Sequence, residues 1–471
     1  MNVQTGLVEE VVPVKSRIAI SAGDAATAIL QSLAASGALT YYFVSLRGLD
    51  AKLAGIVWLL FGIWNAVNDP LFGYISDRTK SALGRRIPYI RYGAPIFVLG
   101  FIAFWIILPG IGNSQTALFI QLLLALFVYD ILYTAIATSF WVMPYEVAVS
   151  NKARGTIYIW KIIFMVFTLV VPFAVEATIK PEVGDAPGIA FFRWAMIALG
   201  VAMGLIVFFS TFFFKEKHYT QEEEQFDFVK SFKACFTNRS FVVFEVLSFT
   251  IMFAQTALMT GIWYYFDVLN MPRPPMLGAL GAGIVLGVVA WIQLRDRWGI
   301  KRCTQVFTLA FAIGCALVAI FGRNVALATA GFFLFGIGFS GGMYLIPLMN
   351  GDVVDMDEHR TGLRREGMYA GINSFITKPA ISIAAWALLS IMKAYGYNEA
   401  LPAAAQSPSA GTGVLLGWAG PTGVLLFLSF LSLFLYPLAG AEWEKIKVKL
   451  AVIHAQKERA YLEAQGYKFV E

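Results

Sequence analysis

Residues Asn65–Tyr89 read NAVNDPLFGYISDRTKSALGRRIPY and lie between two long apolar segments. The first part of this stretch places an ionisable residue, Asp69, within residues that otherwise suit a lipid environment. The second part holds four basic residues in one short loop: Arg78, Lys80, Arg85 and Arg86. A charge at membrane depth is costly and usually marks a substrate or ion pathway. Basic residues beside a span mark its cytoplasmic end. The stretch therefore predicts a polytopic membrane protein, its orientation and a candidate coupling residue.

The composition of the whole chain agrees with this prediction. Of the 471 residues, 58% are hydrophobic and 14% are charged, whereas soluble proteins carry about 25% charged residues. The net charge of +6 does not indicate a nucleic-acid partner, because the basic residues lie in short loops between apolar segments. The three cysteines, Cys235, Cys303 and Cys315, lack the spacing of metal ligands. We expect no metal site.

About twelve apolar segments are long enough to cross a bilayer, which requires about 20 residues each. They lie near 18–45, 51–76, 88–109, 116–146, 155–178, 188–214, 240–268, 274–294, 303–322, 325–350, 366–394 and 412–438. Basic residues cluster after the even-numbered segments, as in Arg295–Arg302 and Arg360–Arg365. This alternation predicts an all-α polytopic protein with both termini in the cytoplasm.

The hydrophilic segment Lys215–Ser240 divides the chain into two halves of six spans. We predict a cytoplasmic N-terminus (1–17), a six-helix bundle (18–214), a central cytoplasmic loop (215–239), a second six-helix bundle (240–438) and a cytoplasmic tail (439–471). The pair Asp77-Arg78 after the second span returns as Asp296-Arg297 after the eighth, which favours a repeat over chance. In transporters built from two such halves, the substrate site lies between them near the midplane.

The chain contains no GxxxxGK[ST] loop, no HExxH motif and no Ser/His/Asp set. These absences argue against an ATP-driven pump and against an enzyme. We expect no cofactor other than a co-transported ion, H⁺ or Na⁺.

Four motifs carry a family resemblance. Asn68–Thr79 reads NDPLFGYISDRT, Phe140–Glu146 reads FWVMPYE, Gly351–Gly367 reads GDVVDMDEHRTGLRREG and Ser374–Lys378 reads SFITK. In this order they resemble the glycoside–pentoside–hexuronide:cation symporters of the major facilitator superfamily, which include the melibiose permease. The resemblance implies two six-helix bundles and cation-coupled sugar transport across a bacterial inner membrane.

By this resemblance, Asp69 is the carboxylate of the cation site and Thr134 lies beside it. The chain has Asn65 where the family usually has an aspartate, and this missing charge favours a proton over sodium without excluding either. The resemblance also places Lys378 opposite the carboxylates. A lysine in an apolar span needs a counter-charge, for which Asp69 is the natural candidate, although Lys378 could instead reach the membrane interface.

The resemblance assigns sugar contacts to Asp24, Tyr133, Trp141 and Lys161. A family carboxylate is missing at Ala137, and Asp130 lies two helical turns earlier on the same face. Our hypothesis is that Asp130 partly replaces it. Each of three residues has a structural alternative. Asp130 could pair with a residue of another helix, Asp24 could serve helix packing, and Lys161 could extend to the membrane interface.

Further charged residues lie near the predicted cytoplasmic ends of the spans. We interpret six of them as ion-pair latches that set the populations of inward-facing and outward-facing states; as topology-setting charges they also orient the chain. They are Asp77, Arg78, Asp352, Asp355, Arg364 and Arg365.

The sequence thus predicts a secondary transporter that couples a cation gradient to uptake of a sugar, glycoside or uronide by alternating access. Two alternatives stay open. The chain could carry a lysophospholipid or another amphiphile, or it could be a non-transporting membrane receptor or scaffold. Substrate, cation and oligomeric state are not determined by the sequence.

Overall fold

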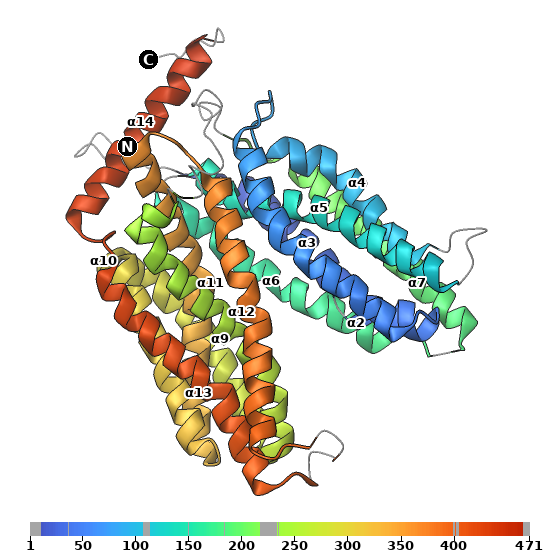
Figure 1. Ribbon diagram of the computed structural model, residues 1–471. Coiled ribbons are helices and arrows are strands. Elements are labelled where there is room, and N and C mark those ends of the chain that lie inside the picture. The colour runs from blue at the N-terminus through green and yellow to red at the C-terminus, as the bar shows by residue number, and fades with distance from the viewer. Residues whose placement is uncertain are drawn as a thin grey trace. The chain divides into compact units, whose positions relative to one another are not determined.

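The computed structural model describes residues 11–35, 37–106, 114–148, 150–182, 184–216, 233, 235–398, 401 and 405–464. The described residues form helices and connections and contain no strand. They fall into two compact units, each of which contains segments from distant parts of the sequence. In Figure 1 most of unit 1 is coloured blue to green, and most of unit 2 green to red.

Unit 1 comprises residues 1–226, 363–372 and 450–471. Its helices are α1 (Val14–Ala35), α2 (Gly37–Tyr41), the π-helical η1 (Tyr42–Leu46), α3 (Ala51–Asp77), α4 (Ile87–Trp105), α5 (Gln115–Val147), α6 (Asn151–Ile179) and α7 (Ala186–Ser210). Helix α1 packs on α5, α6 and α7, while α5 also packs on α3 and α4. Large apolar side chains such as Phe101, Trp105 and Tyr129 fill the space between these helices.

Unit 2 comprises residues 227–362 and 373–449. It contains α9 (Arg239–Leu269), α10 (Arg273–Phe321), α11 (Val325–Thr361), most of α12 (Glu366–Ala394), α13 (Pro408–Ser432), the short η4 (Leu433–Leu435) and the first part of α14 (Ala441–Ala464). Helix α10 packs on α11 and α13, and α9 packs on α11 and α13.

Ten of the described helical stretches are long and apolar enough to cross a membrane. Helix α10 has 49 residues and would extend about 74 Å if straight, more than twice the thickness of a hydrocarbon core. Its backbone breaks at Gly299, where φ is 76°, a conformation that favours glycine. Helix α10 therefore contains two spans, and the 27-residue α3 adds another. With the second span of α10 and with α3, the ten stretches become twelve spans, so the prediction of about twelve spans is confirmed.

The structure differs from the prediction at the eighth and ninth spans. We expected a loop between 294 and 303, but helix assignment continues from Arg273 to Phe321, and only Gly299 departs from helical geometry. Glycine has no Cβ atom and therefore adopts this positive φ readily, so the two spans are joined at the kink without a longer connection. The predicted central loop lies largely outside the described residues, as do residues 1–10 of the predicted N-terminus.

Candidate functional site

A chain of buried polar side chains connects α3 and α5 in unit 1. The Thr134 hydroxyl donates to Asp69 Oδ1 at 3.0 Å and accepts from Asn68 Nδ2 at 3.0 Å. Asn68 Nδ2 also lies 3.1 Å from Asp130 Oδ2. Asp69 is 5% exposed and Asp130 is fully buried. Two carboxylates are thus connected through one amide and one hydroxyl inside the bundle, an arrangement that can bind a proton or a small cation.

This arrangement brings Asp69 and Thr134 together as the family resemblance implies. It also includes Asn68, for which the sequence gives no separate signal. The candidate Asn65 lies one turn before Asp69 on α3 and is half-buried. Asn65 and Asn68 are three residues apart and lie on nearly the same face of a helix, so the sequence alone does not tell which asparagine contacts α5. The role of Asn65 stays a prediction.

Asp130 belongs to this polar chain. It is fully buried, whereas Tyr133 and Trp141 on the same helix are half-buried. Its contact with Asn68 of α3 favours the interhelical-pairing alternative over a replacement for the carboxylate missing at Ala137.

The backbone of α12 approaches α3 at the coupling residue. A Cβ atom added to Gly371 would lie 2.7 Å from the carbonyl oxygen of Asp69, closer than real contacts allow. Gly367 and Gly371 are one turn apart, and small residues at this spacing let two helices approach closely within a membrane. Leu363–Ile372, which follows the tenth predicted span, is part of unit 1. The start of α12 thus packs directly against Asp69.

The predicted sugar contacts Asp24 and Lys161 form an ion pair between α1 and α6. The distance from Lys161 Nζ to Asp24 Oδ2 is 3.1 Å, and the side chains are 12% and 34% exposed. Lys161 Nζ also donates to the carbonyl oxygen of Phe140 at 3.0 Å. Lys161 therefore points toward α1 rather than to the membrane interface.

The other predicted sugar contacts lie on α5. Tyr133 stacks on Tyr129 with ring centroids 6.3 Å apart and ring planes 6° apart, which fixes the orientation of its ring. Tyr133 and Trp141 are both half-buried and two turns apart on the same helical face. An aromatic face of this kind can stack on a sugar ring, so their assignment stays a prediction supported by this geometry.

Six buried residues of unit 1 form a charge cluster at the end of the bundle that carries the basic loop. Its members are Arg85, Arg86, Arg364, Asp77, Glu146 and Glu366. Arg85 Nη2 lies 2.9 Å from Glu146 Oε1 and 2.8 Å from Glu366 Oε2. Arg86 pairs with Asp77 and Arg364 pairs with Glu366. The three cations and three anions compensate each other, as buried charges require.

Asp77 also holds the start of α12. Its two carboxylate oxygens accept from the backbone N–H groups of Gly367 at 2.9 Å and Met368 at 2.8 Å. These groups have no partner within the helix, and a carboxylate at a helix N-terminus is favourable. Asp77 thus connects the start of α12 to Arg86 and to α3, and its role as a latch stays a prediction.

The remaining candidate latches have different surroundings. Arg364 Nη2 donates to the carbonyl oxygen of Tyr145 at 2.6 Å. Arg78 lies 5.0 Å from the centroid of the Tyr74 ring, and Arg365 is buried. In unit 2, Asp352 and Asp355 both pair with Lys447 of α14. The sequence marks these two acids by their position in a charged motif. It gives no signal for Lys447, because the C-terminal tail contains no recognisable motif.

Lys378 lies on the part of α12 that belongs to unit 2 and is half-buried, whereas Asp69 belongs to unit 1. The predicted pairing of these two residues stays a prediction.

Glu216 caps the first turn of α4. Its carboxylate accepts from the backbone N–H groups of Arg85 at 2.7 Å, Arg86 at 2.9 Å and Ile87 at 2.6 Å. Burial and the nearby Glu146 charge outweigh these hydrogen bonds and the attraction of Arg86, and they raise the pKa of Glu216 to about 7. The sequence offers no signal for this role, because Glu216 simply begins the hydrophilic segment.

The raised pKa predicts a pH-dependent stability. Between its ordinary pKa of 4.5 and about 7, Glu216 keeps its proton in the folded state and loses it in the unfolded state. Its contribution is therefore fully present below pH 4.5 and is lost as the pH rises through 7, with an upper limit on the order of 3 kcal/mol. We expect the melting temperature of Glu216→Gln to fall less between these pH values than that of the wild type. Equal falls in both proteins would contradict this assignment.

A second buried glutamate, Glu245 on α9, was also missed. It is 5% exposed and lies near the start of an apolar span. The signal was present, because a lone carboxylate within an apolar segment is the same feature that identified Asp69.

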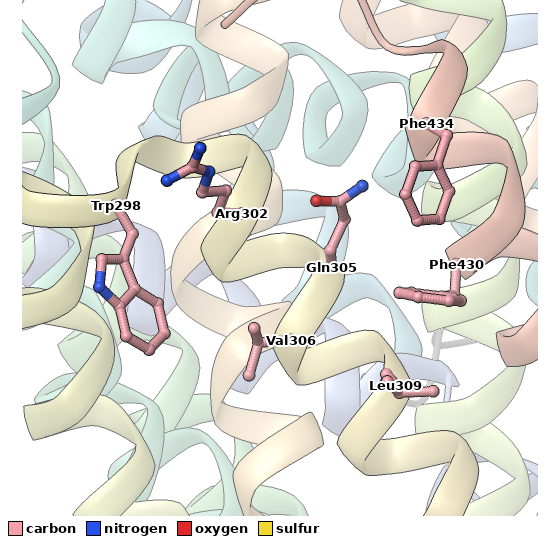
Figure 2. Close-up of a pocket in the computed structure, with 7 residues that line it drawn as sticks. All are labelled: Trp298, Arg302, Gln305, Val306, Leu309, Phe430 and Phe434. Carbon is pink, nitrogen blue, oxygen red and sulfur yellow. The ribbon is translucent and has the colours of Figure 1, made fainter. Parts of the chain in front are cut away.

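A groove in unit 2 lies apart from all of these residues. Figure 2 shows its lining by Trp298, Arg302, Gln305 and apolar side chains of α10, together with Phe430 and Phe434. None of the predicted site residues lines it. Trp298 and Phe434 are exposed, so the groove lies on the surface of unit 2. In the described part of the chain, no cluster of three or more His, Cys, Asp or Glu residues could hold a metal ion.

The family described as MFS/sugar transport protein matches this chain over residues 19–440. The chain belongs to this family. It is therefore a multi-pass membrane transporter and not an enzyme, and the predicted superfamily is confirmed.

Curated relatives match over nearly their whole length. An uncharacterised symporter, YnaJ, of Bacillus subtilis (strain 168) is 25% identical over 463 residues, which cover 95% of this chain and 96% of the relative. The isoprimeverose transporter of Lactiplantibacillus pentosus is 25% identical over 461 residues, covering 95% and 94%. A glucuronide carrier protein homologue of Escherichia coli (strain K12) is 23% identical over 452 residues, covering 92% and 94%.

Solved structures share the fold. A bacterial homologue of the iron transporter ferroportin, in an outward-facing state, has a TM-score of 0.61 at 13% identity, covering 90% of this chain and 99% of that one. The E. coli fucose:proton symporter has a TM-score of 0.57 at 13% identity, covering 88% and 97%. At this identity the likeness concerns the fold alone.

Proposed function

We propose that this transporter is a symporter that couples the entry of a cation to the uptake of a saccharide or glycoside. The observation that carries the proposal is the buried chain Asp69–Thr134–Asn68, against which α12 packs at Gly371. An ion that neutralises Asp69 acts at the contact between α3 and α12. Ion binding can therefore change how readily the start of α12 separates from α3, which is the coupling that symport requires.

A proton suits this site better than sodium. Asp69 Oδ1 accepts from Thr134, and Asn68 Nδ2 lies 3.1 Å from Asp130 Oδ2. A single proton needs only one carboxylate oxygen. The family resemblance adds that one aspartate is replaced by Asn65, which lowers the negative charge available to sodium.

A saccharide is the favoured substrate. Asp24 can accept hydrogen bonds from two sugar hydroxyls, and Tyr133 and Trp141 supply aromatic faces. Relatives named for isoprimeverose and glucuronide transport agree with this substrate class. A lysophospholipid or a scaffold role has no comparable support in the arrangement of the described residues.

The charge cluster serves the conformational cycle. Asp77, Arg364 and Glu366 hold the segment Leu363–Ile372 within unit 1. We infer that these pairs break when the transporter changes state and form again when it returns. Both termini would then lie in the cytoplasm beside the basic loops, as the distribution of Lys and Arg predicts.

Purified protein in proteoliposomes tests the proposal. We expect a proton gradient to drive uptake of at least one member of a panel of mono-saccharides, di-saccharides and glucuronides, without added sodium. Uptake of a lysophospholipid but no sugar would support the amphiphile alternative, and no uptake of any compound would support the scaffold alternative.

Substitution of the ion pair tests the sugar site. Hydrogen bonds to a charged group contribute about 1.5–3 kcal/mol, so Asp24→Ala should weaken binding of the transported sugar at least about tenfold. The double variant Asp24→Asn/Lys161→Met is the control for a structural role. It should recover the melting temperature but not the affinity, and recovery of both would contradict the assignment.

A further inference from the structure

Glu245 is a buried carboxylic acid whose hydrogen-bond partner among the described residues is the neutral side chain of Asn373. It lies about 9 Å along the axis from the first residue of α9 and is 5% exposed. Asn373 Nδ2 lies 3.2 Å from Glu245 Oε1 and 3.3 Å from Oε2, and the same nitrogen lies 2.8 Å from Ser248 Oγ. All three residues belong to unit 2.

These contacts are too few for an anion. The amide of Asn373 has two hydrogens, of which one serves Ser248 and the other is shared between both carboxylate oxygens. Distances of 3.2 and 3.3 Å are at or beyond the long end of ordinary hydrogen bonds. A buried carboxylate that remains ionised normally has a cation or several N–H donors. Glu245 has neither among the described residues.

The helices that pack on α9 do not supply a counter-charge. Helix α13 has no charged residue in its sequence. The other charged or titratable residues of α9, of α11 and of the unit 2 part of α12 are Arg239, Tyr264, Tyr265, Asp267, Tyr344, Asp352, Asp355, Asp357, Glu358, His359, Arg360, Lys378 and Lys393. None of these forms an ion pair with Glu245 in the part of the chain that the structure describes.

We propose that Glu245, Ser248 and Asn373 form a second proton-binding site, located in unit 2 and separate from Asp69. The proton adds to one Glu245 oxygen, and the other oxygen continues to accept from Asn373. The neutral acid allows α12 to pack against α9 at this level. Loss of the proton leaves a poorly compensated anion and favours separation of the two helices. The site's part in the transport cycle rests on the proposed symport, whereas proton binding itself does not.

Sodium suits this site poorly. Its side-chain oxygens come from one carboxylate, one hydroxyl and one amide, and the amide presents its nitrogen to the acid. No cluster of three metal-binding acids, histidines or cysteines includes it within the described residues.

Infrared spectroscopy of the full chain in lipid vesicles tests proton binding directly. Titration between about pH 5 and pH 9 should remove the C=O stretches of protonated carboxylic acids, and we assign one of these bands to Glu245. The band should be absent in Glu245→Gln and present in Asp296→Asn, a control that removes a mostly exposed acid of the same unit. Asp69→Asn and Glu216→Gln should each leave this band in place, which distinguishes Glu245 from the two other acids that we expect to bind a proton. Asn373→Ala should move the loss of the band to higher pH, because it removes the donor that stabilises the anion.

Two outcomes would overturn the proposal. One is a band that persists unchanged in Glu245→Gln, and the other is a band that sodium removes at constant pH. If Glu245→Gln does not reach the membrane, Glu216→Gln protein containing carbon-13 glutamate replaces it. The band must then shift in frequency if it comes from a glutamate, and Asn373→Ala must move its loss to higher pH if that glutamate is Glu245. Absence of sugar uptake by the wild type would contradict the symport proposal without changing any of these spectra.

Discussion

Replacing Asp69 by asparagine is expected to abolish accumulation of the substrate against its gradient. Moving one charge through 100 mV releases about 2.3 kcal/mol, which corresponds to a concentration ratio of roughly fifty. Asparagine has nearly the shape of aspartate and can still accept from Thr134, but it cannot take up a proton. The ratio of internal to external substrate should therefore fall to about one, while exchange of labelled for unlabelled substrate continues.

The matched control lies on the same helix. Asp50 caps the start of α3 through the N–H groups of Lys52 and Leu53, and asparagine is an equally good cap. Asp50→Asn should therefore accumulate substrate like the wild type. Lys378→Ala should lose accumulation as Asp69→Asn does, if these two residues interact as predicted. An Asp69→Asn protein that still concentrates its substrate would refute the proposed coupling.

Replacing Arg85 by methionine is expected to lower the stability of the transporter strongly. Arg85 compensates both Glu146 and Glu366, and all three side chains are almost completely buried. Removing one partner from a buried ion pair typically costs 3–5 kcal/mol, because the remaining charge stays buried. The melting temperature of the purified protein should fall markedly.

A second substitution tests whether charge compensation is the cause. Glu366→Gln alone should also destabilise, because it leaves Arg85 and Arg364 without one anion. The double variant Arg85→Met/Glu366→Gln should be more stable than the sum of the two single effects predicts. Strictly additive effects would indicate that the arginine contributes through packing alone.

The latch residues illustrate how much the sequence reveals. Asp77 and Arg364 were recognisable because they lie in charged motifs beside apolar spans. The other members of the charge cluster also lie in stretches quoted from the sequence, yet these stretches do not say which cation meets which anion. They are Arg85, Arg86, Glu146 and Glu366. Pairing between residues as distant as Arg85 and Glu366 depends on which helices become neighbours, and the chain contains no local signal for that.

The coupling site illustrates the same limit at a finer scale. The NDP sequence at Asn68–Pro70 marks a polar position in α3, and the family resemblance connects it to Thr134. Whether Asn65 or Asn68 completes the site depends on the rotation of α3 about its axis. Packing against Gly371 and α5 decides that rotation.

The sequence by itself determined the membrane character, the approximate spans and the presence of a charge within the bilayer, because hydrocarbon penalises polar groups at every position along the chain. Only the tertiary structure decided which buried polar groups satisfy each other: Asn68 with Asp130, Glu216 with the first turn of α4, and Glu245 with Asn373. The reason is that insertion energy is local and nearly additive over residues, whereas compensation of a buried charge requires two specific atoms within about 3 Å. That distance is set by helix packing.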